Sequence, residues 1–248
     1  MYLFSNYMKF ILIYICAIFI GNSSVQTDNY ATAQKFNEEK NYKESIAICT
    51  SELKKLSPKN TLFTKFLSLR ADSYRESGNF TAGIQDFTAL IEINPKNISY
   101  YVGLSYMYGS IKLYRNCLSA LEKALIIEPK NIYTFNNLSY YSSQAGNYNE
   151  AIKYANEGLK YVIDPMWKGA LLNNRGYGYI GLKAYKEALS DINETIKLDP
   201  NNSFAYCYRA IANINLKNFE TVCADLNKAK SLGGVELTED LRKQYCKD

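Results

Sequence analysis

The strongest constraint on the fold of this chain is an internal repeat that fills most of its 248 residues. Segments such as "LSLRADSYRESGNFTAGIQDFTALIEINP" and "LNNRGYGYIGLKAYKEALSDINETIKLDP" share apolar residues at helical spacing, a central turn and a closing proline. Their starts recur at about 34 residues, a length that one pair of helices fills. The sequence therefore predicts stacked helical hairpins, each too small to bury its apolar face alone.

Three positions of the repeat fix its phase. Position eight, where the two helices of a repeat cross, is small in all copies: Ala33, Ala71, Ser105, Ser139, Gly176 and Ala210. Position seventeen, where the second helix is expected to begin, is aromatic: Tyr42, Phe80, Tyr114, Tyr148, Tyr185 and Phe219. Proline, which disfavours continuation of the preceding helix, closes the first five copies: Pro58, Pro95, Pro129, Pro165 and Pro200. Three extra residues at 61–63 and at 166–168 are expected to lengthen a loop or add a turn of helix, with Trp167 as a packing plug or an anchor at the edge of a groove.

This pattern resembles the tetratricopeptide repeat family, and the tail resembles that of bacterial exported members. The resemblance implies an all-α fold, an α-solenoid of about six helix-turn-helix repeats in one domain. The expected repeats cover residues 26–60, 64–97, 98–131, 132–165, 169–202 and 203–236. A capping helix is expected over residues 237–248, with Leu237, Leu241 and Tyr245 as its apolar stripe.

Arginine and aspartate occur together at two positions of the repeat. Position seven is arginine and position twenty-three is aspartate in the second, fifth and sixth copies, whereas the third copy has Leu104 with Ala120 and the fourth has Leu138 with Tyr154. An antiparallel hairpin brings these two positions together, and arginine can bind a carboxylate through two hydrogen bonds. We therefore expect three ion pairs: Arg70 with Asp86, Arg175 with Asp191, and Arg209 with Asp225. The alternative is that these arginines await an anionic ligand.

The family resemblance places partner binding on the concave face of the solenoid, at the second, fifth, ninth, twelfth and thirteenth positions of each first helix. The candidate peptide-binding residues there are Tyr106, Tyr133, Asn136, Tyr140, Asn173, Tyr177 and Gly181. Tyrosine offers flat apolar area with a polar tip, and an asparagine amide both donates to and accepts from a peptide backbone. The alternative is chance placement, because the chain contains 23 tyrosines and many asparagines.

The stretch "GYGYIG", residues 176–181, matches the dinucleotide-binding pattern G-x-G-x-x-G. That pattern must follow a buried strand and open a helix, whereas here it follows "WKGALLNNR", the first turns of a predicted helix. The match is therefore interpreted as a coincidence, with Gly176 as the small crossing residue. Gly178 and Gly181 are expected to weaken the helix, and Gly181 to open the floor of a peptide groove.

The composition excludes several classes of function. The chain has no histidine, so Ser-His-Asp catalysis, Cys-His catalysis and histidine-based zinc sites are excluded. Its 29 basic residues are scattered among 24 acidic ones, without the dense basic patch that nucleic acid selects. We expect no enzymatic activity, cofactor, metal or nucleic-acid partner.

The N-terminus predicts export. An uninterrupted apolar run, "FILIYICAIFI" (Phe10–Ile20), follows Lys9 and precedes small polar residues, as in a secretory signal over residues 1–25. This predicts a periplasmic or envelope-associated protein, and the alternative is an uncleaved membrane anchor at residues 10–20, the only part of the chain expected to contact a membrane. Removal of the signal would leave five cysteines, so at least one stays free or pairs between chains. The resemblance to exported tetratricopeptide tails implies a disulfide between Cys223 and Cys246.

These features predict a non-enzymatic scaffold of the cell envelope that holds a protein or peptide partner on its concave face. The alternative is a structural or self-assembling component that docks through its edge repeats and leaves the groove idle. The sequence does not name the partner, the oligomeric state or the pathway.

Overall fold

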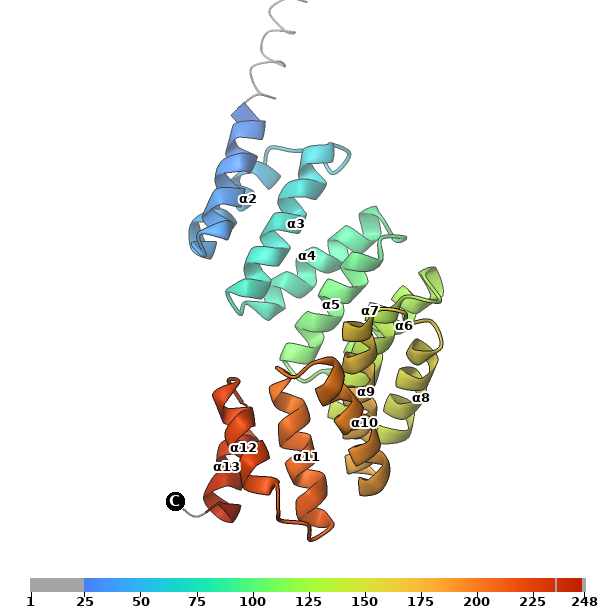
Figure 1. Cartoon of the computed structure of the whole chain (residues 1–248). Helices are drawn as coiled ribbons and strands as arrows, with labels where there is room; N and C mark the ends of the chain where they lie inside the picture. Colours follow the sequence, from blue (N-terminus) through green and yellow to red (C-terminus); the bar gives the residue numbers. More distant parts are fainter. Residues whose placement is uncertain (1–24, 235, 247–248) are drawn as a thin grey trace, which may run out of the picture. The chain divides into compact units, whose positions relative to one another are not determined.

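The computed structural model describes residues 25–234 and 236–246, and these residues form helices without any strand (Figure 1). The predicted signal segment lies outside the described residues. A helix over residues 25–38 is followed by twelve more: α2 (Tyr42–Leu53), α3 (Thr61–Glu76), α4 (Phe80–Ile93), α5 (Ile98–Ser110), α6 (Tyr114–Ile127), α7 (Ile132–Gln144), α8 (Tyr148–Leu159), α9 (Pro165–Gly181), α10 (Tyr185–Leu198), α11 (Ser203–Asn215), α12 (Val222–Ser231) and α13 (Glu236–Tyr245). The predicted all-α solenoid fold is confirmed. Within the described ranges, no helix is both long and apolar enough to cross a bilayer.

The chain divides into two compact units, residues 1–111 and residues 112–248, where the sequence analysis expected one domain. The division separates α5 from α6, the two helices of the third predicted repeat. In a repeat stack each element contacts only its neighbours, so no single core ties the whole chain together. We call the two parts the N-terminal unit and the C-terminal unit.

Asparagine and aspartate side chains determine where the first helix of most repeats begins. The side-chain oxygen at the N-cap accepts a hydrogen bond from a backbone N–H of the first turn, which otherwise has no partner. These caps are Asn60 on α3, Asn97 on α5, Asn131 on α7, Asp164 on α9 and Asn202 on α11. Asp164 accepts from both Met166 and Trp167, and Pro165 then occupies the first turn, where its missing N–H is harmless. Pro165 thus begins α9, whereas the sequence analysis assigned it to the end of a repeat.

The three-residue insertions lengthen helices. Helix α3 has 16 residues and α9 has 17, whereas α5, α7 and α11 have 13 each. Of the two outcomes considered, an added turn is the one observed. The second helices α2, α4, α6, α8 and α10 all begin at the aromatic residue of position seventeen, but α12 begins three residues later, at Val222. Phe219 is therefore exposed, and it stacks on Tyr245 of α13 at 6.2 Å.

Small residues lie where helices cross, as the sequence predicts. The residues at position eight are all buried, and Gly176 lies so close to Ile192 that an added Cβ would be 2.9 Å from Cγ1 of that side chain. In the N-terminal unit, Ala33 packs in a core with Phe66 and Leu69. In the C-terminal unit, Ala210 packs with Val222 and Leu226. The apolar core therefore runs along the helix crossings.

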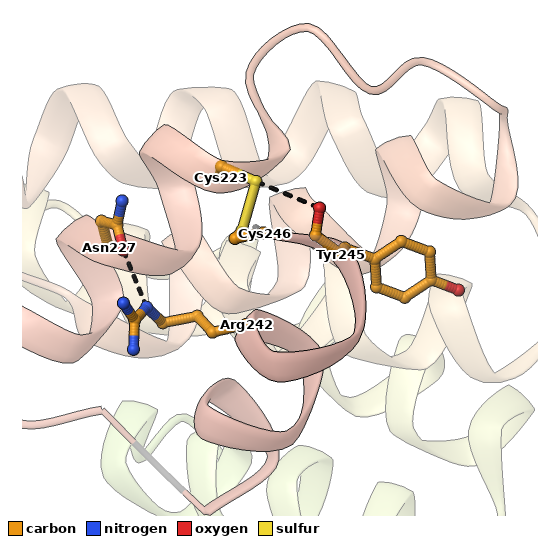
Figure 2. Close-up of a disulfide and its surroundings, with 5 residues drawn as sticks. All are labelled: Cys223, Asn227, Arg242, Tyr245 and Cys246. Carbon is orange, nitrogen blue, oxygen red and sulfur yellow. Dashed lines mark hydrogen bonds between the residues drawn. A yellow bond between two sulfur atoms is a disulfide. The ribbon is translucent and has the colours of Figure 1, made fainter. Parts of the chain in front are cut away.

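The last helix caps the C-terminal unit. Leu241 and Tyr245 of α13 pack against the core around Val222, as expected, but Leu237 is 48% exposed and Thr238 is buried in its place. The buried stripe thus starts one residue later than predicted, with the spacing 238, 241 and 245. Figure 2 shows the disulfide between Cys223 of α12 and Cys246, whose Cα atoms are 5.5 Å apart, and the hydrogen bond that Arg242 donates to Asn227 at 2.7 Å.

The other described cysteines, Cys49, Cys117 and Cys207, are free and buried. Burial raises the pKa of the Cys49 and Cys117 thiols to about 12. Since the thiolate is the reactive form, these side chains serve as small apolar groups.

All three expected Arg–Asp pairs are present, each with two parallel hydrogen bonds. Arg175 donates from Nε to Asp191 Oδ2 at 2.6 Å and from Nη2 to Oδ1 at 2.7 Å. The same two contacts join Arg70 to Asp86, at 2.8 and 2.7 Å, and Arg209 to Asp225, at 2.8 and 2.5 Å. The aspartate side chains are at most 7% exposed.

Each arginine also makes a third contact that the sequence analysis did not foresee. Its Nη1 donates to a side-chain oxygen at position twenty-five of the preceding repeat: Thr50 for Arg70, Asn156 for Arg175 and Asn193 for Arg209. Every arginine thus ties its own hairpin to the second helix of the repeat before it. Because Nε, Nη1 and Nη2 are all engaged, the alternative of an arginine awaiting an anionic ligand is not supported.

Replacing Arg175 alone is expected to lower the free energy of unfolding by about 3 kcal/mol, because Asp191 would stay buried without its partner. The chain provides a matched control in its third repeat, which has Leu104 and Ala120 at these positions. The double variant Arg175→Leu/Asp191→Ala should therefore lose clearly less than Arg175→Leu in urea denaturation. Equal losses in both variants would contradict a buried, paired carboxylate.

Removing the disulfide is expected to lower the free energy of unfolding by about 3 kcal/mol, the value for a loop closed over a separation of 23 residues. Denaturation of the Cys223→Ser/Cys246→Ser variant measures the loss. A reductant should shift the midpoint of the wild-type chain to that of the variant and leave the variant unchanged, and a wild-type midpoint that ignores the reductant would contradict the bond.

Candidate functional site

Five tyrosines of the C-terminal unit lie close enough to affect one another electrostatically, and we call this cluster the tyrosine face. Its rings are Tyr114 of α6, Tyr140 of α7, Tyr148 of α8, Tyr177 of α9 and Tyr208 of α11. Burial, followed by the nearby phenols of Tyr148, Tyr140 and Tyr114, raises the pKa of Tyr177. Burial also raises the pKa of Tyr208, with Tyr177 and Tyr140 adding to the shift. Both effects favour the neutral phenol at Tyr177 and Tyr208, and the mutual influence indicates that these tyrosines lie close together.

The centre of the tyrosine face is a stack of two rings. Tyr177 and Tyr208 lie nearly parallel, with centroids 4.7 Å apart and an interplanar angle of 11°. Tyr208, which the sequence analysis did not select, is buried and packs with Ile192 and Ala205, so it holds Tyr177 from behind. Tyr140 is exposed, and its ring contacts Tyr141 edge-on at 5.1 Å. Tyr177 is thus half-buried and preorganised, and Tyr140 presents its exposed part to a partner while its hydroxyl is hydrogen-bonded to Gln144.

The two selected asparagines differ in how they are used. Asn136 is already engaged, because its Oδ1 and its backbone oxygen both accept hydrogen bonds from Asn174 Nδ2, at 2.8 and 3.1 Å. Asn174, which was not selected, therefore links α9 to α7. Asn173 is only 8% exposed, and its Oδ1 accepts no hydrogen bond from the described residues. A buried acceptor without a donor is costly, so Asn173 would gain from a partner N–H, and Ser143 Oγ of α7 is likewise buried without a partner among the described residues.

Gly181 does not open the floor of a groove, contrary to the expectation from the sequence. A Cβ at this position would overlap the ring of Tyr148, so the missing side chain makes room for that ring. Gly178 similarly makes room for Ile152, whose Cγ1 would be 2.9 Å from an added Cβ. Helix α9 runs without interruption through Gly178 and ends at Gly181. The pair thus lets α9 pack closely on α8.

The two remaining selected tyrosines contact aromatic rings that do not belong to the tyrosine face. Tyr133 of α7 is exposed and contacts Trp167 of α9 edge-on, with ring centroids 5.5 Å apart. Tyr106 is exposed and belongs to the N-terminal unit, where it contacts Phe80 at 6.4 Å. The predicted stripe of Tyr106, Tyr140 and Tyr177 is therefore divided between the two units.

The face around the tyrosines is uncharged. In α7, α9 and α11, the second, fifth, ninth, twelfth and thirteenth positions share one side of each helix, because they fall within about 100° of one another. None of these residues is charged: Tyr133, Asn136, Tyr140, Ser143, Gln144, Ala170, Asn173, Tyr177, Ile180, Gly181, Phe204, Cys207, Ile211, Ile214 and Asn215. The described residues also contain no cluster of acidic residues and cysteines able to hold a metal ion.

Gly181→Ala is expected to lower the thermal unfolding midpoint, although alanine favours a helix over glycine by about 1 kcal/mol. The overlap with the Tyr148 ring outweighs that gain, because overpacking costs about 1–3 kcal/mol. Gly169 of the same helix is the matched control, since its added Cβ would lie 3.4 Å from Leu198 Cβ in ordinary contact. Gly169→Ala should raise the midpoint, and Tyr148→Ala should abolish the penalty of Gly181→Ala. A stabilising Gly181→Ala would contradict the packing described above.

Comparison with protein families supports the repeat. Residues 64–97 match the family model described as tetratricopeptide repeat. Among curated proteins, RNA polymerase II-associated protein 3 of Xenopus tropicalis is 35% identical over 124 residues, which cover 49% of this chain and 17% of that protein. Stress-induced-phosphoprotein 1 of Caenorhabditis elegans is 24% identical over 54% of this chain and 52% of its own length. The chain thus spans between about a sixth and about a half of these relatives.

Solved structures share the fold at low sequence identity. A tetratricopeptide repeat protein from Parabacteroides merdae superposes with a TM-score of 0.70 at 19% identity, over 90% of this chain and 84% of that one. YrrB, described as a TPR protein with an unusual peptide-binding site, has a TM-score of 0.55 at 16% identity, over 79% of this chain and 97% of its own. The chain therefore carries a tetratricopeptide repeat at residues 64–97 and has the fold of tetratricopeptide-repeat proteins.

Proposed function

We propose that this protein is a non-enzymatic scaffold and that its tyrosine face binds an extended, uncharged peptide segment of a partner protein. The observation that carries this proposal is the buried Oδ1 of Asn173, which has no donor among the described residues. It lies one helical turn from Tyr177, a ring already fixed by its stack on Tyr208. Once the Asn173 side chain, which is 8% exposed, reorients toward the surface, a backbone N–H of a bound peptide would satisfy its amide oxygen, while peptide side chains would cover the tyrosine rings.

The absence of charge on this face narrows the class of peptide. A charged residue of the partner would lose water on binding and find no opposite charge at the recognition positions of α7, α9 and α11. The face therefore fits a neutral segment, held by ring contacts and by hydrogen bonds to the peptide backbone. Peptide binding by YrrB, a protein of the same fold, is compatible with this proposal.

We also propose that the scaffold acts at the cell envelope. The support is the sequence of residues 1–25, whose apolar run follows a single lysine as in a secretory signal. The disulfide between Cys223 and Cys246 adds to that support, because structural disulfides persist in oxidising compartments.

Photo-crosslinking tests the binding face directly. Replacing Tyr140 by benzoylphenylalanine keeps an aromatic ring at the exposed edge of the tyrosine face, and illumination of the envelope fraction should attach a partner peptide that mass spectrometry identifies. Tyr154 of α8 is the matched control position, because it is half-buried and its hydroxyl donates to Glu122 at 3.1 Å. The crosslink should form from position 140 and not from position 154. Its yield should change little between ~0.1 and ~1 M salt, since no charge pair is involved.

Substitutions within the face separate binding from assembly. Tyr177→Ala combined with Asn173→Ala should abolish the crosslink from position 140 while the circular dichroism spectrum stays helical. If that crosslink persists in the variant, and deletion of residues 26–60 instead abolishes assembly, then a self-assembling structural component explains the protein better.

A further inference from the structure

The α8–α9 loop and the first turn of α9 carry two of the three most exposed large apolar side chains among the described residues of the C-terminal unit, the third being Ile126 of α6 at 79%. Ile163 is 98% exposed and Met166 is 73% exposed. Trp167 and Tyr133 form their edge-on pair beside them, and Tyr161 is exposed with the Lys130 ammonium 5.5 Å above its ring. Apart from Ile126, these six residues, which we call the loop patch, join the α8–α9 loop to the first turn of α7. Of these six residues, only Tyr133 is among the candidate peptide-binding residues.

Packing within the chain does not explain the loop patch. Trp167 contacts Tyr133, as a packing plug would, but Ile163 and Met166 project into solvent. Helix α9 does not need them to begin, because the Asp164 side chain caps it and Pro165 occupies its first turn. The two apolar side chains therefore gain nothing from folding. A contact with something outside the chain would explain their exposure.

The chemistry of the loop patch fits a lipid surface better than a protein partner. Residues that anchor protein interfaces lie in packed pockets that exclude water, whereas Ile163 of the α8–α9 loop and Met166 of the first turn of α9 are largely exposed. Tryptophan and tyrosine prefer the boundary between lipid headgroups and acyl chains, and lysine can keep its charge among the headgroups. The loop patch combines these residue types: its two most exposed side chains are the apolar Ile163 and Met166, its aromatic side chains are less exposed, and the Lys130 ammonium lies over the Tyr161 ring.

We propose that the loop patch inserts into the interfacial layer of a lipid bilayer, with Ile163 and Met166 among the acyl chains and Trp167 and Tyr133 at the headgroup level. This surface contact requires no membrane-spanning helix. It is independent of the peptide proposal, because the Asn173 acceptor and the Tyr177–Tyr208 stack lie outside the loop patch.

The protein provides its own probe, because Trp167 is the single tryptophan of the chain. The full chain is mixed with vesicles of phosphatidylcholine, alone or with phosphatidylglycerol. Its tryptophan emission should shift to shorter wavelength, and lipids brominated near the headgroup should quench it. Since the signal comes only from residue 167, membrane binding by the apolar run at residues 10–20 cannot produce it unless the loop patch also enters the bilayer.

Two variants complete the test. Ile163→Ser/Met166→Ser should lose the wavelength shift and most of the quenching, because the aliphatic tip is removed while Trp167 is kept. Leu182→Ser is the matched control, since Leu182 is an exposed apolar residue at the opposite end of α9, and it should behave as the wild type. Circular dichroism shows that each variant is folded.

Three results would overturn the lipid proposal. The first is an emission spectrum that no vesicle composition changes. The second is quenching that the Ile163→Ser/Met166→Ser variant retains in full. The third is a shift that appears without vesicles as the protein concentration rises, or only on adding envelope proteins, because a second copy or a protein partner would then cover the loop patch.

Discussion

The structure depends on a contact in which one arginine joins three helices. Arg175 of α9 binds Asp191 of α10 through two hydrogen bonds and Asn156 of α8 through a third, so one side chain closes its own hairpin and ties it to the previous one. A hairpin cannot bury its apolar face alone, and the register between neighbours must be fixed by contacts between them. A planar guanidinium suits this task because its donors have fixed directions. In the fourth repeat, which lacks the charged pair, Tyr154 donates to Glu122 of the preceding repeat and provides a comparable link by other chemistry.

The sequence predicted the features that recur at the same position of several repeats. It missed the features that differ between repeats. The pairs of positions seven and twenty-three were predictable because both residue types appear and disappear together. The third partner of each arginine was not, because position twenty-five is Thr50 in one repeat and Asn156 or Asn193 in others, and no single residue type marks it. The late start of α12 was also missed, because it differs from the start of the other second helices although position seventeen is aromatic in all of them. Phe219 is the aromatic residue of position seventeen, as in the other repeats, but its ring stacks on Tyr245 of the capping helix.

The sequence placed Gly181 of α9 correctly in the repeat but gave the wrong reason for the glycine. The repeat phase placed Gly181 on the face of the selected tyrosines, and an absent side chain there suggested space for a ligand. The space is filled by the Tyr148 ring, which comes from the preceding repeat and is invisible to any pattern within α9. Burial of Tyr148 against the glycine brings its phenol near Tyr177, where it contributes to the raised pKa of that side chain. Gly181 therefore helps to build the tyrosine face, although it does not belong to its exposed surface.

Asparagine and tyrosine are frequent in this chain, so their presence on one face could be chance. The contacts of the individual asparagines bear on this alternative. Many of the asparagines are accounted for by helix starts, where Asn60, Asn97, Asn131 and Asn202 satisfy backbone N–H groups. Asn136 and Asn174 are used against each other between helices. Folding thus gives a purpose to these residues and leaves Asn173 with a buried acceptor that no described residue satisfies. Composition explains why asparagine is frequent in this chain, but it does not explain why this one, beside a preorganised ring stack, is left without a donor. The proposed partner, which would supply the missing N–H, accounts for it.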